Sequence, residues 1–353
     1  MRQLVIRLGA VWCGLMVALL LAEGVLRVLD LAPSDGVGTV TEAQFAAIPG
    51  ILAPGQDLVD KRDPRLPHHV TTNSLGYRGE EFPLAKPRGE FRVLFTGDSF
   101  AYGDFVDDGQ TFPAQLEKNL NGVCGRVRVI NAGLDNGTIV DETPMIERGL
   151  PTSPDLAVVL FSENDVSDMN RRSTWDHLAD NRHAKSRFPL SIAYPVLRRT
   201  ALWNFGLNFV ATMRVRRNPV HIVMTAAADN DSVTTRLRES YRAALVRLRD
   251  TLATRGIPLV LTVYPSHHAV LSEAKRDQVN WITTTATAEG IPVVNLLPPL
   301  AASGLPMEQI YLLPFDGHPS PRGYGISASY LASRLSESHL VPNSCGAIAS
   351  SAR

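Results

Sequence analysis

Apolar segments of strand length alternate with amphipathic segments of helical length from residue 92 to residue 338. This alternation is typical of a parallel β-sheet whose strands are connected by helical crossovers. The predicted strands are residues 92–96, 127–131, 156–161, 257–263 and 291–295. The predicted helices are residues 111–121, 137–149, 233–255, 270–288 and 323–338. The sequence therefore predicts an α/β fold for this part of the chain.

The amino-terminal segment has a different composition. The run from Leu8 to Ala22 contains no charged residue, and Arg2 and Arg7 precede it. Its length and composition predict a helix that crosses a lipid bilayer through residues 8–31. A cleaved secretory signal has a similar composition, but no small-residue cleavage site follows the run, so we favour an uncleaved anchor. The basic residues before the run predict that the remaining chain lies outside the cytoplasm.

These patterns suggest how the chain is divided. The expected parts are a cytoplasmic tip and anchor (1–31), a stalk and irregular lead-in (32–90), the α/β domain (91–340) with an insertion (166–231), and a tail (341–353). Within the insertion, residues 194–217 are rich in Trp, Phe and Leu, with arginines at both ends. Such a segment can lie over a site or on a membrane surface. We favour the alternative that it packs on the domain as an ordinary insertion helix.

Charge and cysteine content narrow the possible partners. The chain has 35 basic and 35 acidic residues, which argues against a nucleic-acid partner. Cys13 lies in the apolar run, so Cys124 and Cys345 are the two cysteines of the exported part. They could form a disulfide in an oxidising compartment, and two unpaired thiols are an equally open alternative.

Polar motifs follow the predicted strands where each strand ends. Gly97, Asp98 and Ser99 come directly after the first strand, and a helical pattern follows them. A serine hydroxyl in such a turn lies beside free backbone N–H groups, at the edge where open α/β sheets bind ligands. Asp98 and Ser99 could instead only cap the next helix. Three further stretches occupy similar positions: INAGLDNGT (130–138), LFSENDVSD (160–168) and PFDGHPSPRGYG (314–325).

The four blocks together resemble those of the SGNH, or GDSL-like, hydrolase family. The resemblance rests on the GDSF sequence, on Gly133 and Asn164, and on the D-G-H sequence with Asp316 and His318, and it covers about residues 90–338. It implies a flavodoxin-like three-layer sandwich with a five-stranded parallel sheet in the order 2-1-3-4-5. It also implies ester chemistry that needs neither a cofactor nor a metal.

The resemblance assigns a role to each of these residues. Ser99 would be the nucleophile, His318 the base that takes its proton, and Asp316 the carboxylate that orients the imidazole and stabilises its charged form. The oxyanion hole would consist of the N–H of Ser99, the N–H of Gly133 and the side chain of Asn164. Fixed donors of this kind stabilise the negative oxygen of the transition state.

Besides Phe100, which stands where leucine is commoner and should be tolerated as a packing change, the chain departs from the family pattern in two places. Ser162 stands where a glycine is usual, and Glu163 follows it, so a carboxylate would lie near the oxyanion hole if its side chain pointed inward. The spacing between Asp316 and His318 is one residue shorter than the commonest form. Both departures make an inactive site on the same fold an alternative to be tested.

Other polar residues have weaker signals. Tyr102 could line the pocket or only pack, and Asp98 and Asp165 are expected to orient loops through hydrogen bonds to the backbone. His267 could contact the substrate, although a surface loop position is the simpler interpretation for it and for His268. No carboxylate or cysteine lies at a spacing that supports a metal site there.

The lead-in NSLGYRGEEFP and the apolar amino terminus resemble those of a membrane-anchored bacterial branch associated with surface polysaccharides. We therefore expect a single-pass protein of the bacterial inner membrane with its catalytic domain on the periplasmic side. The expected activity is that of a serine esterase that removes or transfers an O-acetyl group on an extracytoplasmic polysaccharide. A non-catalytic glycan-binding or assembly protein, and a lipid esterase, are the alternatives.

Overall fold

The computed structural model describes residues 2–29, 31, 47–171, 173, 175–176, 180, 187–197, 199–206, 209–210 and 231–342. The chain divides into two compact units. One unit comprises Met1–Gly36, Val59–Pro67 and Ala179–Ala226, and the other comprises Val37–Leu58, His68–Leu178 and Ala227–Arg353. The choice between a Cys124–Cys345 disulfide and two unpaired thiols stays open, because Cys345 and the side chain of Cys124 lie outside the described part of the chain.

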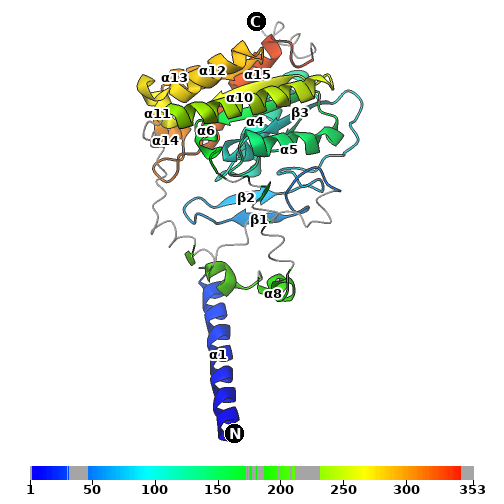
Figure 1. The fold of residues 1–353 in the computed structure, drawn as a ribbon. Coiled ribbons are helices and arrows are strands. Elements are labelled where there is room, and N and C mark those ends of the chain that lie inside the picture. Colours follow the sequence, from blue (N-terminus) through cyan, green and yellow to red (C-terminus); the bar gives the residue numbers. More distant parts are fainter. Residues whose placement is uncertain are drawn as a thin grey trace. The chain divides into compact units, whose positions relative to one another are not determined.

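The first unit contains a long apolar helix, α1 (Arg2–Val28), and a shorter one, α8 (Leu190–Leu197) (Figure 1). Among the described residues, α1 is the helix long and apolar enough to cross a membrane, a test that a signal sequence also passes. The sequence of α1 favours a helix because leucine and alanine, both strong helix formers, predominate between residues 8 and 22. Near its end Arg27 pairs with Glu23, one turn earlier.

The second unit is built on a parallel sheet of five strands: β3 (Phe91–Thr96), β4 (Val127–Asn131), β5 (Leu156–Ser162), β6 (Leu259–Tyr264) and β7 (Val293–Asn295). Their spatial order is β4-β3-β5-β6-β7, and every neighbouring pair is parallel. The predicted α/β class and strand order 2-1-3-4-5 are confirmed. Parallel strands place all their carboxyl ends at one edge of the sheet, which is where the polar motifs meet.

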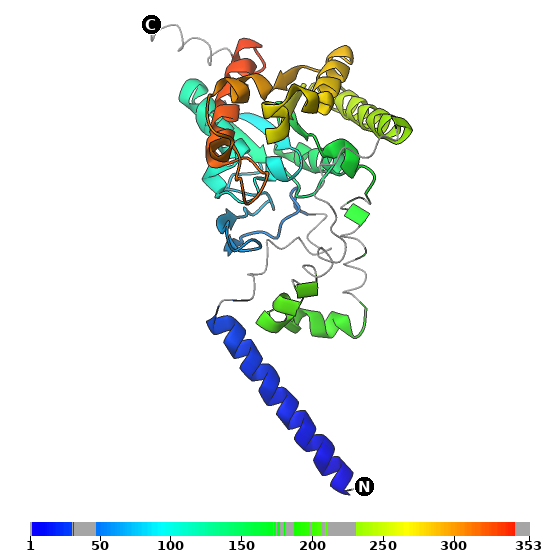
Figure 2. The ribbon, with the colours of Figure 1, turned by 90° about the vertical axis from the view of Figure 1, so that its left-hand side faces the viewer.

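Helices cover both faces of this sheet. On one face lie α5 (Ile139–Gly149), α10 (Asp231–Ala253) and α12 (Asp277–Ala288). On the other face lie α4 (Phe112–Cys124), α13 (Leu297–Ala302) and α15 (Pro321–Glu337), of which α4 and α15 pack side by side (Figure 2). The short helices and turns are α3 (Ser99–Tyr102), α6 (Asp165–Asp168), α11 (His267–Leu271), α14 (Met307–Ile310), η1 (Asp108–Gln110), η2 (Leu150–Thr152) and η3 (Glu273–Lys275). The result is a three-layer arrangement.

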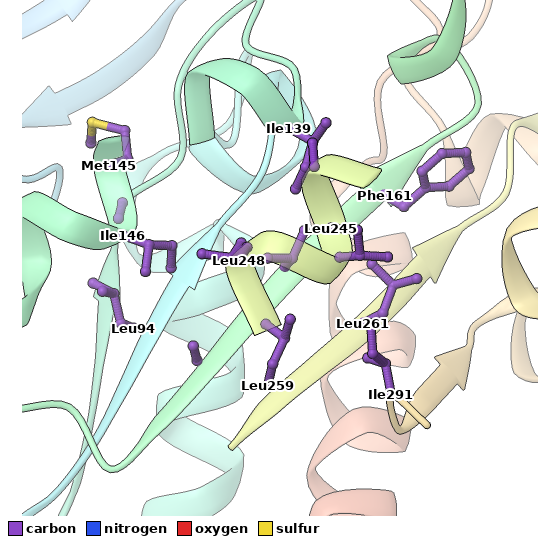
Figure 3. Packing of buried hydrophobic residues seen from close by; sticks show 14 of the residues in the cluster. Leu94, Ile139, Met145, Ile146, Phe161, Leu245, Leu248, Leu259, Leu261 and Ile291 are labelled. Atoms are coloured by element: carbon purple, nitrogen blue, oxygen red, sulfur yellow. The ribbon is translucent and has the colours of Figure 1, made fainter. Parts of the chain in front are cut away.

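The alternation of side chains along each strand creates two separate cores. Leu94, Leu259 and Leu261 face α10, and Figure 3 shows Leu245 and Leu248 of that helix packed over them. Neighbouring strand residues point the other way, toward α4 and α15. A strand that is buried on both faces has a nearly continuous apolar sequence. Strand β5, in which all seven residues are buried, is an example.

The lead-in before the sheet is more structured than we expected. It contains the two-stranded sheet of β1 (Asp57–Asp60) and β2 (His68–Thr71). Ile51, Tyr77 and Phe82 are buried in the same core as α10. Part of the segment expected to be a stalk and irregular lead-in thus packs on the domain. Its few apolar residues have no regular spacing, so their burial cannot be recognised from periodicity.

The segment predicted as one helix at residues 270–288 is instead three pieces, α11, η3 and α12. Ser272 separates the first two because its backbone is extended, with φ −138° and ψ 125°. The other four predicted helices correspond to α4, α5, α10 and α15 with small differences at their ends.

Candidate active site

Ser99 lies in a tight turn between β3 and α3. Gly97 has φ +153°, and a Cβ atom on it would lie 2.8 Å from the side chains of Ala101 and Leu160. Only glycine fits such a position. Asp98 then caps α3 by accepting a hydrogen bond of 2.9 Å from the N–H of Phe100. The capping role considered for Asp98 is therefore real, and it presents Ser99 at the carboxyl edge of the sheet.

The structure brings the predicted triad together. Ser99 Oγ lies 2.8 Å from Nε2 of His318, and Nδ1 of the same ring contacts Asp316 Oδ1. The backbone N–H of His318 also donates to Asp316 Oδ1, at 2.8 Å. This hydrogen bond fixes the short D-G-H loop. Because an ionised carboxylate can only accept, Nδ1 carries a proton, and in the neutral ring Nε2 is then the atom that can accept the serine O–H.

The His318 ring is held between two aromatic rings. Its centroid lies 5.0 Å from that of Phe100 and 5.2 Å from that of Phe105. Phe105 has φ 65°, a conformation that costs free energy for a bulky residue and persists only where surrounding contacts impose it. The loop after α3 therefore helps to position the imidazole.

The pKa of His318 reflects two opposing effects. Burial lowers it, but the hydrogen bond and negative charge of Asp316, together with the charges of Asp104 and Asp98, raise it above the ordinary imidazole value. A base with a raised pKa takes a proton more readily from a hydroxyl group.

Gly133 lies where no side chain fits. A Cβ atom on it would be 2.2 Å from the backbone nitrogen of Tyr102, so this glycine allows the loop after β4 to lie against α3. Its N–H donates to Asn131 Oδ1 at 3.0 Å. That hydrogen bond competes with the oxyanion role predicted for Gly133.

Asn164 follows β5 and faces carboxylates. Its Nδ2 donates to Asp168 at 2.9 Å and makes a longer contact of 3.4 Å with Asp98, while its Oδ1 accepts from Ser162 Oγ at 2.7 Å. The structure places the Asn164 amide next to the residue that precedes Ser99. Its side chain is engaged by Asp168, which the sequence did not indicate.

Glu163 is directed to the start of α11. Its Oε1 accepts a hydrogen bond of 2.7 Å from the N–H of Ser266. Burial raises the pKa of this carboxyl, and the contacts with Ser266 oppose the increase. Glu163 thus connects the ends of β5 and β6.

A match to a family model covers residues 95–326, the region that holds all of these groups. The family is the GDSL-like lipase/acylhydrolase family. The chain belongs to this family. It is a carboxylic ester hydrolase of the GDSL type. No curated protein matches the sequence.

Solved structures with a similar arrangement include several hydrolases. A lipolytic protein of the G-D-S-L family from Desulfitobacterium hafniense is 14% identical, with a TM-score of 0.42, covering 69% of this chain and 99% of its own. A GDSL-like lipase from Bacteroides thetaiotaomicron is 15% identical, with a TM-score of 0.39 and coverage of 72% and 92%. An acetylxylan esterase from Geobacillus stearothermophilus is 16% identical, with a TM-score of 0.42 and coverage of 70% and 94%.

In this GDSL hydrolase, buried carboxyl groups lie behind the turn that carries Ser99. Ser162 Oγ is 2.7 Å from Asp98 Oδ2 and 3.1 Å from Asp165 Oδ1. A hydroxyl group has one proton to donate, so it cannot satisfy two ionised carboxylates and the Asn164 oxygen at once. Burial raises the pKa of Asp98 and Asp165, which favours a shared proton in this group. Ser162, unusual for the family, is what links the two acids.

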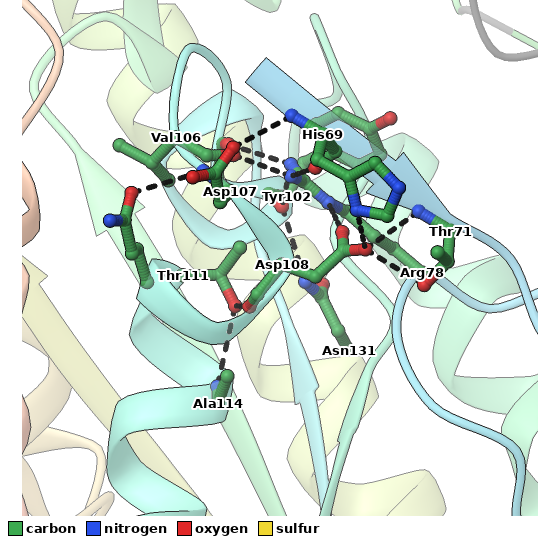
Figure 4. Close-up of polar contacts among 12 residues, drawn as sticks. His69, Thr71, Arg78, Tyr102, Val106, Asp107, Asp108, Thr111, Ala114 and Asn131 are labelled. Atoms are coloured by element: carbon green, nitrogen blue, oxygen red, sulfur yellow. Dashed lines mark hydrogen bonds and ion pairs between the residues drawn. The ribbon is translucent and has the colours of Figure 1, made fainter. Parts of the chain in front are cut away.

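Arg78 is a residue that the sequence analysis did not single out. Its side chain is buried, and its guanidinium donates to the carbonyls of Gly103 and Val106 at 2.6 Å each and to Asp108 at 2.8 Å (Figure 4). The group also lies 4.9 Å from the ring centroid of Tyr102. The lead-in motif that contains Arg78 therefore holds the loop that carries Phe105. The Gly-Tyr-Arg-Gly sequence at residues 76–79 of that motif was the signal available in the sequence.

The two predicted substrate contacts differ in their surroundings. Tyr102 is buried, and its carbonyl accepts from Arg78 and Asn131, so this residue is part of the packed turn. His267 is at the start of α11, where its ring lies 3.9 Å from that of His268, and burial and that neighbour lower its pKa. Among the residues that the structure describes, no group of three or more His, Cys, Asp or Glu side chains could hold a metal ion.

Proposed function

We propose that this chain is a membrane-anchored serine esterase that removes an O-acetyl group from an extracytoplasmic polysaccharide through an acyl-Ser99 intermediate. The observation that carries the proposal is a pair of contacts made by the His318 ring: Nε2 lies 2.8 Å from Ser99 Oγ, and Nδ1 contacts Asp316. These are the contacts that activate a serine hydroxyl, which is a poor nucleophile by itself.

The proposed reaction has two halves. Ser99 Oγ attacks the ester carbonyl while His318 Nε2 takes its proton, and Asp316 stabilises the imidazolium that forms. The ring then returns the proton to the departing sugar oxygen, leaving an ester on Ser99. Water, activated by the same Nε2, releases the acid. If a sugar hydroxyl group takes the place of water, the same residues transfer the acyl group.

The oxyanion would be held by the N–H of Ser99, the N–H of Gly133 and the Asn164 amide. The Asn164 amide has two hydrogens. One makes the 2.9 Å bond to Asp168, and the other is in the weak 3.4 Å contact with Asp98, so this second hydrogen is the one that can turn to the substrate. For Gly133, the substrate oxygen must compete with Asn131.

The proposed location and substrate rest on the amino-terminal part of the chain. Helix α1 has the length and composition of a membrane anchor. The lead-in resembles that of a branch associated with surface polysaccharides, and its Arg78 supports the loop beside His318. Both features favour an ester that lies near the outer face of the inner membrane.

A lipid esterase is the second candidate. The unit that contains α1 also exposes apolar side chains around α8, among them Phe188, Ile192 and Val196. A lipid-contacting surface of this kind would suit an enzyme whose substrate lies in the bilayer.

The nucleophile can be tested with the purified full-length protein, an aryl acetate and a serine-directed phosphonate. We expect labelling that disappears in Ser99→Ala, and hydrolysis in His318→Ala that falls by about 10³-fold or more. His339→Ala, at an exposed histidine after α15, is the control and should hydrolyse the aryl acetate at the wild-type rate. Persistent labelling of Ser99→Ala, or a folded wild-type protein that is never labelled, would exclude Ser99 as the nucleophile.

The substrate class needs a separate comparison. Acetate release from an acetylated polysaccharide is measured beside fatty-acid release from a phospholipid, with Ser99→Ala as the blank in both assays. The proposal expects acetate release to be faster. Faster fatty-acid release would favour the lipid esterase instead.

A further inference from the structure

In the segment from residue 187 to residue 210, several of the described apolar side chains are exposed. Ile192 and Val196 are 71% and 66% exposed, and their spacing of four places them on one face of α8. Phe205 and Phe209 have the same spacing, and their rings stack with centroids 6.5 Å apart. An exposed apolar surface of this extent indicates an interaction site.

This segment is bonded to the end of α1 within the same compact unit. Glu23 accepts hydrogen bonds of 2.9 Å from the N–H groups of both Ala201 and Leu202, where a helical stretch begins. Arg27 donates to the carbonyl of Arg199 at 2.7 Å and also pairs with Glu23. Charge-assisted bonds of this kind hold the segment at a defined position along α1.

That position has a defined depth if α1 crosses a bilayer. Glu23 is the first charged residue after the apolar run that ends at Ala22, so within the span predicted at residues 8–31 it lies toward the outer interface. A segment bonded to Glu23 lies at the same level. There its apolar side chains can enter the acyl region while Arg187 and Arg199, both exposed, meet lipid phosphates.

We propose that the described residues of this segment, 187–197, 199–206 and 209–210, form an interfacial membrane element whose partner is the phospholipid surface around α1. The inference rests on the membrane anchor of the proposed function, and it adds a second contact with the bilayer. The continuity of the segment with α1 through Glu23 and Arg27 is what favours lipid over a second copy of the chain or another protein.

The depth of the segment can be measured on the full chain in nanodiscs of phosphatidylethanolamine and phosphatidylglycerol. A nitroxide is attached to Val196→Cys or Phe205→Cys in a background in which the three native cysteines are serine. Two further sites serve as references: Leu15→Cys in the middle of α1, and Thr254→Cys, an exposed position directly after α10. Accessibility to oxygen is compared with accessibility to a water-soluble nickel chelate.

We expect the labels at residues 196 and 205 to be more accessible to oxygen than to nickel, as at residue 15, and the label at residue 254 to show the reverse. Labels at 196 and 205 that resemble residue 254, with residue 15 still in lipid, would overturn the inference and leave the anchor intact. Labels shielded from both reagents would indicate a protein partner and overturn it. A label at residue 15 that is more accessible to the nickel chelate than to oxygen would overturn the anchor and the inference together.

The bond to α1 has its own test. Glu23→Ala should move the labels at residues 196 and 205 toward water while leaving residue 15 unchanged, and Val25→Ala, an exposed position on the same helix, should change neither. Labels that keep their depth in Glu23→Ala would overturn the role given to Glu23.

Discussion

At the scale of single residues, the His318 imidazole is subject to opposite influences. Burial disfavours its charged form, whereas Asp316, Asp104 and Asp98 favour it, and the net effect raises its pKa. In the proposed mechanism, Nε2 of His318 must be unprotonated to accept the Ser99 proton. Activity should therefore decline as the pH falls through the His318 pKa, at a pH above the ordinary imidazole value of about 6.5.

Asp316→Asn tests this balance. The substitution removes the largest influence that raises the pKa, so the acid limb of kcat/KM against pH should move to lower pH. The plateau should fall by about 10³- to 10⁴-fold because the ring loses its orientation. The measurement is the pH profile of aryl acetate hydrolysis.

Asp104→Asn is the matched control for charge alone, since Asp104 also raises the pKa of His318. It should move the acid limb in the same direction by less and keep most of the plateau rate. An acid limb that moves to higher pH in Asp316→Asn would contradict the assigned role.

At the scale of elements, the loop between α3 and η1 depends on a side chain from the lead-in. Arg78 reaches the carbonyls of Tyr102, Gly103 and Val106, and this loop contains the strained Phe105. A lysine has one ammonium group and cannot reproduce the fork of bonds that a guanidinium makes. The loop would then relax and the support of the imidazole would be lost.

Arg78→Lys should therefore lower kcat for aryl acetate by about 10²-fold, as expected for a small displacement of catalytic groups, with a lesser effect on KM. Arg92→Lys is a matched control, because Arg92 is also buried and its guanidinium donates to three carbonyls, those of Pro83, Leu84 and Thr152. Arg92 lies at the start of β3, the end of the strand away from Ser99. Arg92→Lys should lower thermal stability and keep kcat. Equal kcat values in the two variants would show that Arg78 has no positioning role.

At the scale of the whole molecule, buried acids make folding stability depend on pH. Both carboxylate oxygens of Glu142 are buried without a hydrogen-bond partner among the described residues. Burial and the nearby Asp98 and Asp141 raise its pKa well above the usual range. A raised pKa in the folded state contributes stability that is present below the unfolded pKa, about 4.3, and is lost as the pH rises toward the folded value.

Glu142→Gln should remove this loss. We expect the melting temperature of the variant to exceed that of the wild type by an amount that grows as the pH rises above about 5. Glu147→Gln, on the exposed side of the same helix, is the control and should follow the wild type at every pH. A difference that shrinks with rising pH would contradict the raised pKa of Glu142.

The sequence by itself determined the α/β class, the five strands and the position of the Gly-Asp-Ser turn, because apolar periodicity and turn residues act over a few neighbours. The strand order and the residue roles came from the family resemblance of the four blocks. Only the tertiary structure decided that Glu163 bonds to Ser266 and that Arg78 supports the loop after α3. The first contact joins residues that are 103 positions apart in the sequence, and the second joins residues that are 25 positions apart. Which side chains meet over such separations depends on tertiary packing, which no local sequence pattern encodes.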